Sequence, residues 1–171
     1  MNVRENFVHA FEASVATNPM YSLFRTLPVC SELDLPESML LFSCFDAREI
    51  AAGTTIYEAG TASENVMYLV LAGEAAVASS WHDTYVTLKA GDVFGLFSFL
   101  DEGRNHSATV RASTDLTVLT ISRPYFDVIT LEDPALGNQM LRFMFRLLSR
   151  MSLKLESEYA AIHHYATGRR I

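Results

Sequence analysis

This chain of 171 residues is poor in cysteine and has fewer basic than acidic residues. Its two cysteines, Cys30 and Cys44, are too few for a disulfide framework or a zinc site, so we expect buried thiols in a reducing cytoplasm. A formal net charge of −7 argues against a nucleic-acid partner, because phosphate backbones are bound by clustered lysines and arginines. No apolar run approaches the ~20 residues of a membrane span, which argues against a membrane partner.

Catalytic and metal-binding signatures are also missing. No Ser-His-Asp or Cys-His arrangement stands in a supporting motif. A β-roll enzyme with a metal site would need closely spaced histidines followed by a carboxylate, and no such set occurs among His9, His82, His106, His163 and His164. The sequence therefore predicts a protein without catalytic residues, metal or cofactor, which is not an enzyme.

The first part of the chain, residues 1–47, has the apolar spacing of helices. Apolar residues recur every four positions at Phe7, Phe11 and Val15. Asn18 and Asp34 each precede a proline by one or two positions, and this combination is typical of a helix start. We predict an N-terminal helical segment that packs on the rest of the domain.

The second part, residues 48–122, changes to the alternating pattern of β-strands, with glycines between the apolar stretches. Short strands are predicted at residues 54–58, 65–71, 74–78, 84–89, 92–94, 107–112 and 116–121. Many short strands separated by regular turn signals favour an antiparallel roll or barrel over a parallel sheet with crossover helices.

The third part, residues 123–171, returns to helical spacing, with a short helix followed by a long one that begins at Pro134. One apolar stripe of the long helix is assigned to packing on the roll and comprises Leu136, Met140, Phe143 and Leu147. A second stripe has heptad spacing and comprises Leu141, Met144, Leu148, Met151 and Leu155. It predicts a homodimer through this helix; the alternative is a long helix that lies on its own domain.

Together the three parts predict one structural domain of the α+β class. Its centre is an antiparallel β-roll, similar to a jelly roll or double-stranded β-helix, with N-terminal helices and a long C-terminal helix.

Five features of the chain carry a family resemblance: residues 48–60, residues 66–77, the run Gly91-Asp92-Val93-Phe94-Gly95, residues 107–112, and the turn at residues 123–126 with the later Pro134. In this order they resemble the cyclic nucleotide-binding domain family, over about residues 20–160. The resemblance is to the sensor half of catabolite-activator-type transcription factors. It implies a regulatory function, a cyclic nucleotide as the ligand, and a phosphate-binding cassette that follows Gly95.

The cassette departs from the family pattern at two positions. The family places a glutamate directly after the glycine, for the ribose 2′-hydroxyl, and an arginine just before the exit strand, for the phosphate. Leu96 and His106 occupy these positions here, while the loop keeps its length. An unpaired hydroxyl costs about 1–3 kcal/mol and a charge-assisted bond contributes about 1.5–3 kcal/mol. Affinity for cAMP or cGMP is therefore expected to fall by roughly 100-fold or more.

Two routes to phosphate binding remain open. Arg104 lies two residues before His106 and can replace the missing arginine, although a solvated loop residue is the simpler interpretation. His106 is protonated more readily beside a phosphate, which would strengthen binding as the pH falls. The candidate ligand-binding residues are Gly95, Leu96, Phe97, Ser98, Arg104, His106, Ser107 and Ala108.

Two functions follow as hypotheses. The first is a degenerate cyclic nucleotide-binding fold of bacterial signalling, which does not bind cAMP or cGMP in the usual way and acts by contacting another signalling protein. The second is a genuine receptor for a cyclic nucleotide or another small ligand, which repositions the long helix on binding. No helix-turn-helix segment follows the long helix, and the ends favour a complete, cytoplasmic protein whose output passes through a partner.

Overall fold

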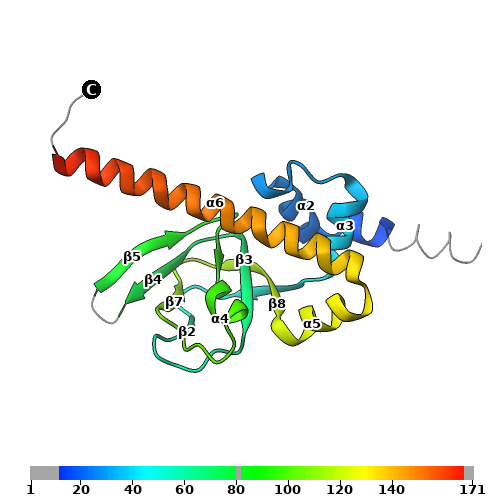
Figure 1. The fold of residues 1–171 in the computed structure, drawn as a ribbon, viewed down its shortest axis with the longest axis horizontal. Coiled ribbons are helices and arrows are strands. Elements are labelled where there is room, and N and C mark those ends of the chain that lie inside the picture. The colour runs from blue at the N-terminus through cyan, green and yellow to red at the C-terminus, as the bar shows by residue number, and fades with distance from the viewer. Residues whose placement is uncertain (1–11, 80–81, 168–171) are drawn as a thin grey trace, which may run out of the picture.

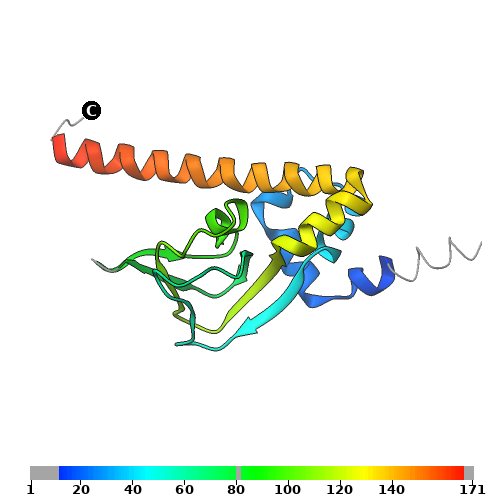
Figure 2. The same cartoon turned by 60° about the horizontal axis from the view of Figure 1, so that its bottom comes forward.

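The computed structural model describes residues 12–79 and 82–167 of the chain. Two four-stranded antiparallel sheets form a β-roll, and a long helix runs along one side of the whole molecule (Figures 1 and 2). The roll, the N-terminal helices and the long C-terminal helix confirm the predicted fold class. The helix predicted around Phe7 and Phe11 falls mainly outside the described residues.

The N-terminal helices begin at the predicted capping residues. α2 (Pro19–Thr26) follows Asn18, whose side chain accepts a hydrogen bond from the Met20 N–H at 2.9 Å. The short 3-10 helix η1 (Pro28–Cys30) comes next, and α3 (Leu35–Ser43) then follows Asp34. Asp34 and Glu37 each accept a hydrogen bond from the backbone of the other. Such caps pair N–H groups that a first helical turn leaves free, and each contributes about 1 kcal/mol.

The two sheets have the strand orders β1-β8-β3-β6 and β2-β7-β4-β5. The first sheet consists of β1 (Asp46–Ile50), β3 (Val66–Ala72), β6 (Val93–Phe94) and β8 (Leu116–Ser122). The second consists of β2 (Thr55–Tyr57), β4 (Ala75–Ser79), β5 (His82–Leu88) and β7 (Thr109–Ala112). Apart from β1, each strand overlaps a predicted one.

The alternation of residues did not predict β1, and the predicted boundary at residue 47 falls inside this strand. Its residues are exposed except for the half-buried Ile50. Pairing with β8 holds it at the sheet edge, from Asp46 opposite Thr120 to Ile50 opposite Leu116. An edge strand without a buried face has no apolar alternation, so only its long-range pairing reveals it.

Both faces of the central strands β3 and β8 are buried, and each face belongs to a different core. In β3, Met67 and Leu69 pack against the helices, whereas Tyr68 and Val70 point into the roll. β8 divides in the same way, with Leu119 and Ile121 toward the helices and Leu116 and Val118 inside the roll. Since successive side chains point to opposite faces, a strand covered on both sides is a continuous apolar run.

α5 (Arg123–Glu132) and α6 (Pro134–Thr167) complete the fold. The predicted packing stripe of α6 is buried at Met140, Phe143 and Leu147 and half-buried at Leu136, but it packs in a core shared by the N-terminal helices and the outer face of β3 and β8, not on the roll alone. With 34 residues, α6 is about 50 Å long; its second half runs beside the roll, and its C-terminal end reaches past it (Figure 1). Every described side chain from residue 152 to residue 166 is exposed. None of the described helices has the length and hydropathy that a membrane span requires.

The double-sided burial of β8 predicts a large cost for removing one of its side chains. Leu119 is fully buried, and Leu119→Ala is expected to lower the free energy of unfolding by about 2–5 kcal/mol. Leu131 on α5 is 81% exposed, so Leu131→Ala is the matched control and should change stability by less than about 0.5 kcal/mol. Urea denaturation followed by circular dichroism measures both; equal effects would contradict this core assignment.

Candidate ligand-binding site

The cassette lies between β6 and β7 and contains a short helix. Gly95 has a φ of 74° and caps α4 (Leu96–Leu100). Any larger residue is disfavoured here, because L side chains rarely adopt this φ and a Cβ would run into the carbonyl oxygen of Val66. Gly95 therefore lets the chain turn close against β3. The sequence predicts a loop in place of α4, since a helix of five residues is too short to show a periodic pattern.

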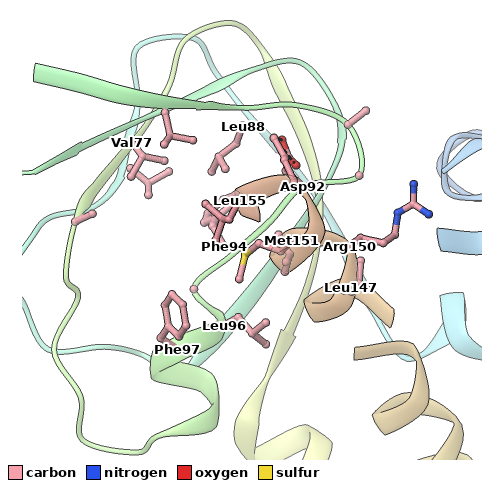
Figure 3. Close-up of a pocket in the computed structure, with 18 of the residues that line it drawn as sticks. Val77, Leu88, Asp92, Phe94, Leu96, Phe97, Leu147, Arg150, Met151 and Leu155 are labelled. Atoms are coloured by element: carbon pink, nitrogen blue, oxygen red, sulfur yellow. Dashed lines mark hydrogen bonds and ion pairs between the residues drawn. The ribbon is translucent and has the colours of Figure 1, made fainter. Parts of the chain in front are cut away.

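A cavity of about 560 Å³ lies between the roll, the cassette and α6 (Figure 3). Its apolar lining comes from all three and includes Val77, Val86, Leu88, Phe94, Leu96, Val110, Met151 and Leu155. The volume is within the range of about 300–1,000 Å³ that is typical of small-molecule sites. This cavity is the candidate ligand-binding site.

The predicted cassette residues divide between this cavity and a smaller neighbouring recess. Those that line the cavity are Gly95, Leu96, Phe97, Ser107 and Ala108. Ser98, Arg104 and His106 border an adjoining recess of about 40 Å³, whose wall also includes Gly95, Phe97, Ser107 and Ala108. Leu96 is only 3% exposed, so a hydrocarbon side chain is buried where the resemblance implies a glutamate. The structure thus brings the apolar part of the cassette to the cavity, whereas Arg104 and His106 lie in the adjoining recess.

His106 packs flat against Tyr57 of β2, with ring centroids 3.8 Å apart and ring planes inclined by 6°. Its backbone is also held: the His106 N–H donates to the Thr61 carbonyl oxygen at 3.0 Å, and its own carbonyl accepts from the Gly60 N–H at 2.7 Å. Burial lowers the pKa of His106 below its usual 6.5, and the nearby Glu64 carboxylate offsets part of this effect. The ring is therefore mainly neutral at physiological pH.

Arg104 lies on the outer side of the cassette. Its Nη1 is 3.7 Å from Oδ2 of Asp101, and its side chain is 53% exposed. The guanidinium carbon also lies 6.0 Å from the centroid of the Phe97 ring. Exposed ion pairs of this kind contribute only about 0–1 kcal/mol. The environment of Arg104 is that of a solvated loop residue.

α6 supplies cavity residues that the sequence analysis missed. The Lys154 ammonium donates to both carboxylate oxygens of Asp92, at 3.0 Å each, and so joins α6 to the roll at the cavity. One turn earlier Arg150 lines the cavity rim, where its guanidinium points away from the centre (Figure 3). Asp92 and Lys154 are 62 positions apart, so no local motif in the sequence could have paired them.

The predicted dimer seam lies in more than one environment. Met144 is 3% exposed in the core of its own chain, which corrects its assignment to a partner helix. The physical reason is that Met144 follows the buried Met140 by one turn and so lies on the same face of α6. Leu148 and Met151 are half-buried against the same core. Leu141 and Leu155 are 40% and 56% exposed.

The comparison with protein families decides which family this fold belongs to. The family model of the cyclic nucleotide-binding domain matches residues 47–133, which include the roll, the cassette and α5. The chain belongs to this family. Cyclic nucleotide-binding domains are regulatory modules and in general not enzymes, and this confirms the coarse function that the resemblance implied.

Solved structures of cyclic nucleotide-binding proteins share the fold. A cyclic nucleotide-binding domain from Methylobacillus flagellatus superposes with a TM-score of 0.69 at 20% identity, over 94% of this chain and 88% of that one. The catabolite activator protein of Thermus thermophilus superposes with a TM-score of 0.56 at 26% identity, over 77% of this chain and 63% of that one.

Relatives are also found among curated proteins. An uncharacterized NTE family protein of Mycobacterium tuberculosis is 29% identical over 125 residues, which are 72% of this chain and 21% of that protein. An uncharacterized NTE family protein of Mycobacterium bovis matches to the same extent. The chain spans about a fifth of the length of these curated relatives.

Protonation of His106 is expected to destabilise the fold. Because folding lowers its pKa below 6.5, the unfolded chain binds this proton more readily than the folded one. Neutral His106 therefore makes its full contribution to the free energy of unfolding above pH 6.5. This contribution is lost as the pH falls from 6.5 through the lower pKa of the folded state. Urea denaturation about one unit above and one unit below pH 6.5 gives the free energy of unfolding at each pH. On acidification it should fall further for the native chain than for His106→Gln. Identical decreases would contradict the assignment of this pH dependence to His106.

Proposed function

We propose that this chain is a non-enzymatic regulatory module that does not bind cAMP or cGMP in the usual pose of its family and that acts by contacting another signalling protein. The observation that carries the proposal is the composition of the cavity wall. Leu96 is buried at the glutamate position, and neither Arg104 nor His106 lines the cavity. The cassette therefore has neither the glutamate that the family places against the ribose hydroxyl nor, at residue 106, the arginine that it places against the phosphate.

The size of the missing contacts supports this proposal. A buried hydroxyl left unpaired costs about 1–3 kcal/mol, and a charge-assisted bond contributes about 1.5–3 kcal/mol. Lys154 of α6 lines the same cavity but already donates to both oxygens of Asp92. A phosphate that approached Lys154 would have to displace this carboxylate, so the helix does not replace the missing arginine without a further cost.

We further propose that the projecting half of α6 binds a second copy of the chain. Beyond Leu155, which lines the cavity, large apolar side chains recur along it at helical spacing and are between 68% and 92% exposed: Tyr159, Ile162 and Tyr165. No described part of the chain covers these three side chains, which lie toward the C-terminal end of α6, where the helix reaches past the roll (Figure 1). Exposed aromatic and aliphatic side chains in such a stripe are typical of helix pairing.

A receptor that moves its long helix is the second candidate function. Its support is that Met151 and Leu155 of α6 line the same cavity as the strands and the cassette. A bound molecule would therefore touch both the roll and α6. If its affinity differed between two positions of the helix, it would shift the balance between them.

Cyclic nucleotides are expected not to stabilise the native chain. A ligand at 100 times its dissociation constant stabilises a protein by about 2.7 kcal/mol. With cAMP or cGMP at millimolar concentration, we expect an unchanged melting temperature in differential scanning fluorimetry. A dose-dependent rise would contradict the proposal and favour the receptor.

A double variant tests the cassette directly. Leu96→Glu with His106→Arg restores both family side chains, and the buried glutamate should lower stability without ligand and recover it with cAMP. The matched control is Leu96→Gln with His106→Arg, which keeps the shape of the side chain without its negative charge. We expect cAMP to stabilise this control less than the glutamate variant. If the first double variant ignores cAMP, the two side chains are not what prevents binding.

Pairing through α6 predicts that a charge in the exposed stripe separates the copies. Ile162→Glu should halve the molar mass measured by light scattering after gel filtration, because Ile162 is 68% exposed and faces no described part of its own chain. Ala160→Glu adds the same charge to an exposed position off the heptad spacing and should leave the mass unchanged. A native chain of monomer mass would refute the dimer.

A further inference from the structure

The chemistry of the cavity favours a ligand unlike a nucleotide. The side chains nearest its centre in Figure 3 are hydrocarbon or thioether groups, among them Val77, Leu88, Met151 and Leu155. They come from β4, β5 and α6, so the apolar surface surrounds the space from more than one side. An apolar cavity of about 560 Å³ leaves its water poorly hydrogen-bonded, so an apolar occupant gains free energy by displacing it.

The charged residues at this cavity cancel one another. They are Asp92, Arg150, Lys154 and Glu158, two acidic and two basic. Asp92 and Lys154 form an ion pair, Arg150 and Glu158 are exposed, and Arg150 points away from the centre (Figure 3). No net charge therefore attracts a phosphate or a carboxylate, and solvent at the rim can accommodate a small polar group.

The shape of the site selects a small molecule over a docked helix. The roll, the cassette and α6 line the cavity from three directions and leave its rim open to solvent. A helix with its side chains is about 10 Å across. A docked helix would therefore have to displace α6, but the buried side chains of Phe143 and Leu147 hold α6 against the core.

We propose that this cavity binds a small molecule with an uncharged hydrocarbon body, which lies between β4, β5, the cassette and α6. Such a ligand needs neither the glutamate nor the arginine that the cassette lacks. Leu96 borders the site but packs in the helix-side core, so this position presents no carboxylate to a ligand. The inference goes beyond the proposed function, which requires only that cAMP and cGMP do not bind in their usual pose.

The test uses N-phenyl-1-naphthylamine, an uncharged probe whose fluorescence rises in apolar surroundings, with the full chain. We expect saturable binding at one site per chain. Hexanol, octanol and decanol should then displace the probe, and each step of two methylenes should strengthen displacement about tenfold. A response that does not saturate, or that is independent of chain length, would overturn the proposal.

Variants locate the probe in this cavity. Val86→Phe fills it from β5 and should weaken probe binding at least tenfold. Leu155→Glu places a charge on the α6 side, at a position that is 56% exposed and therefore tolerant of the change, and should have the same effect. Ile162→Glu lies two turns further along the same exposed stripe, outside the cavity, and should bind as the native chain does.

The outcomes separate this inference from the proposed function. Equal losses in Leu155→Glu and Ile162→Glu would assign probe binding to the helix surface or its pairing, and would overturn the cavity site. If Val86→Phe and Leu155→Glu both bound the probe as tightly as the native chain, the cavity site would be overturned as well. Displacement of the probe by cAMP would refute the proposed function and the hydrocarbon class together, whereas an unbound probe with no cAMP response refutes the inference alone.

Discussion

The burial of both faces of β3 and β8 is the constraint on which the rest of this structure depends. Each strand needs a partner layer on either side, and one layer cannot serve both. The second sheet covers one face and closes the roll, while α2, α3 and α6 cover the other. Phe143 of α6 holds this arrangement together by packing against Phe24 and Phe45, at ring-centroid distances of 5.8 and 6.2 Å.

The position of the cavity follows from the same packing. Because the first half of α6 is fixed over the helical core, the direction of its second half is also determined, and it passes beside the open side of the roll (Figure 2). There the Asp92–Lys154 ion pair joins the helix to the roll. Gly95 brings the cassette against β3 on the remaining side. The frame of a cyclic nucleotide-binding domain is thus complete, whereas its cassette presents hydrocarbon to the space inside.

Much of the fold could be predicted from local patterns, and the misses have physical reasons. Asn18 and Asp34 indicated helix starts because capping depends only on neighbouring residues. β1 was missed because an exposed edge strand has no apolar face, and α4 because it is shorter than two turns. The site was predicted in part: Gly95 and Leu96 line the cavity, but His106 stacks on Tyr57, a contact between residues far apart in the chain.

The sequence by itself determined the order of helices and strands apart from β1 and α4, the family, and the absence of the usual cassette side chains at Leu96 and His106. These are properties of residue type and spacing, and they do not depend on what the residues touch. Only the tertiary structure decided that Met144 packs inside its own chain, that Met151 and Leu155 line a cavity, and that Lys154 pairs with Asp92. A helix can bury the same stripe against its own domain, a ligand or a second helix, and the choice depends on which surface the rest of the chain brings within reach.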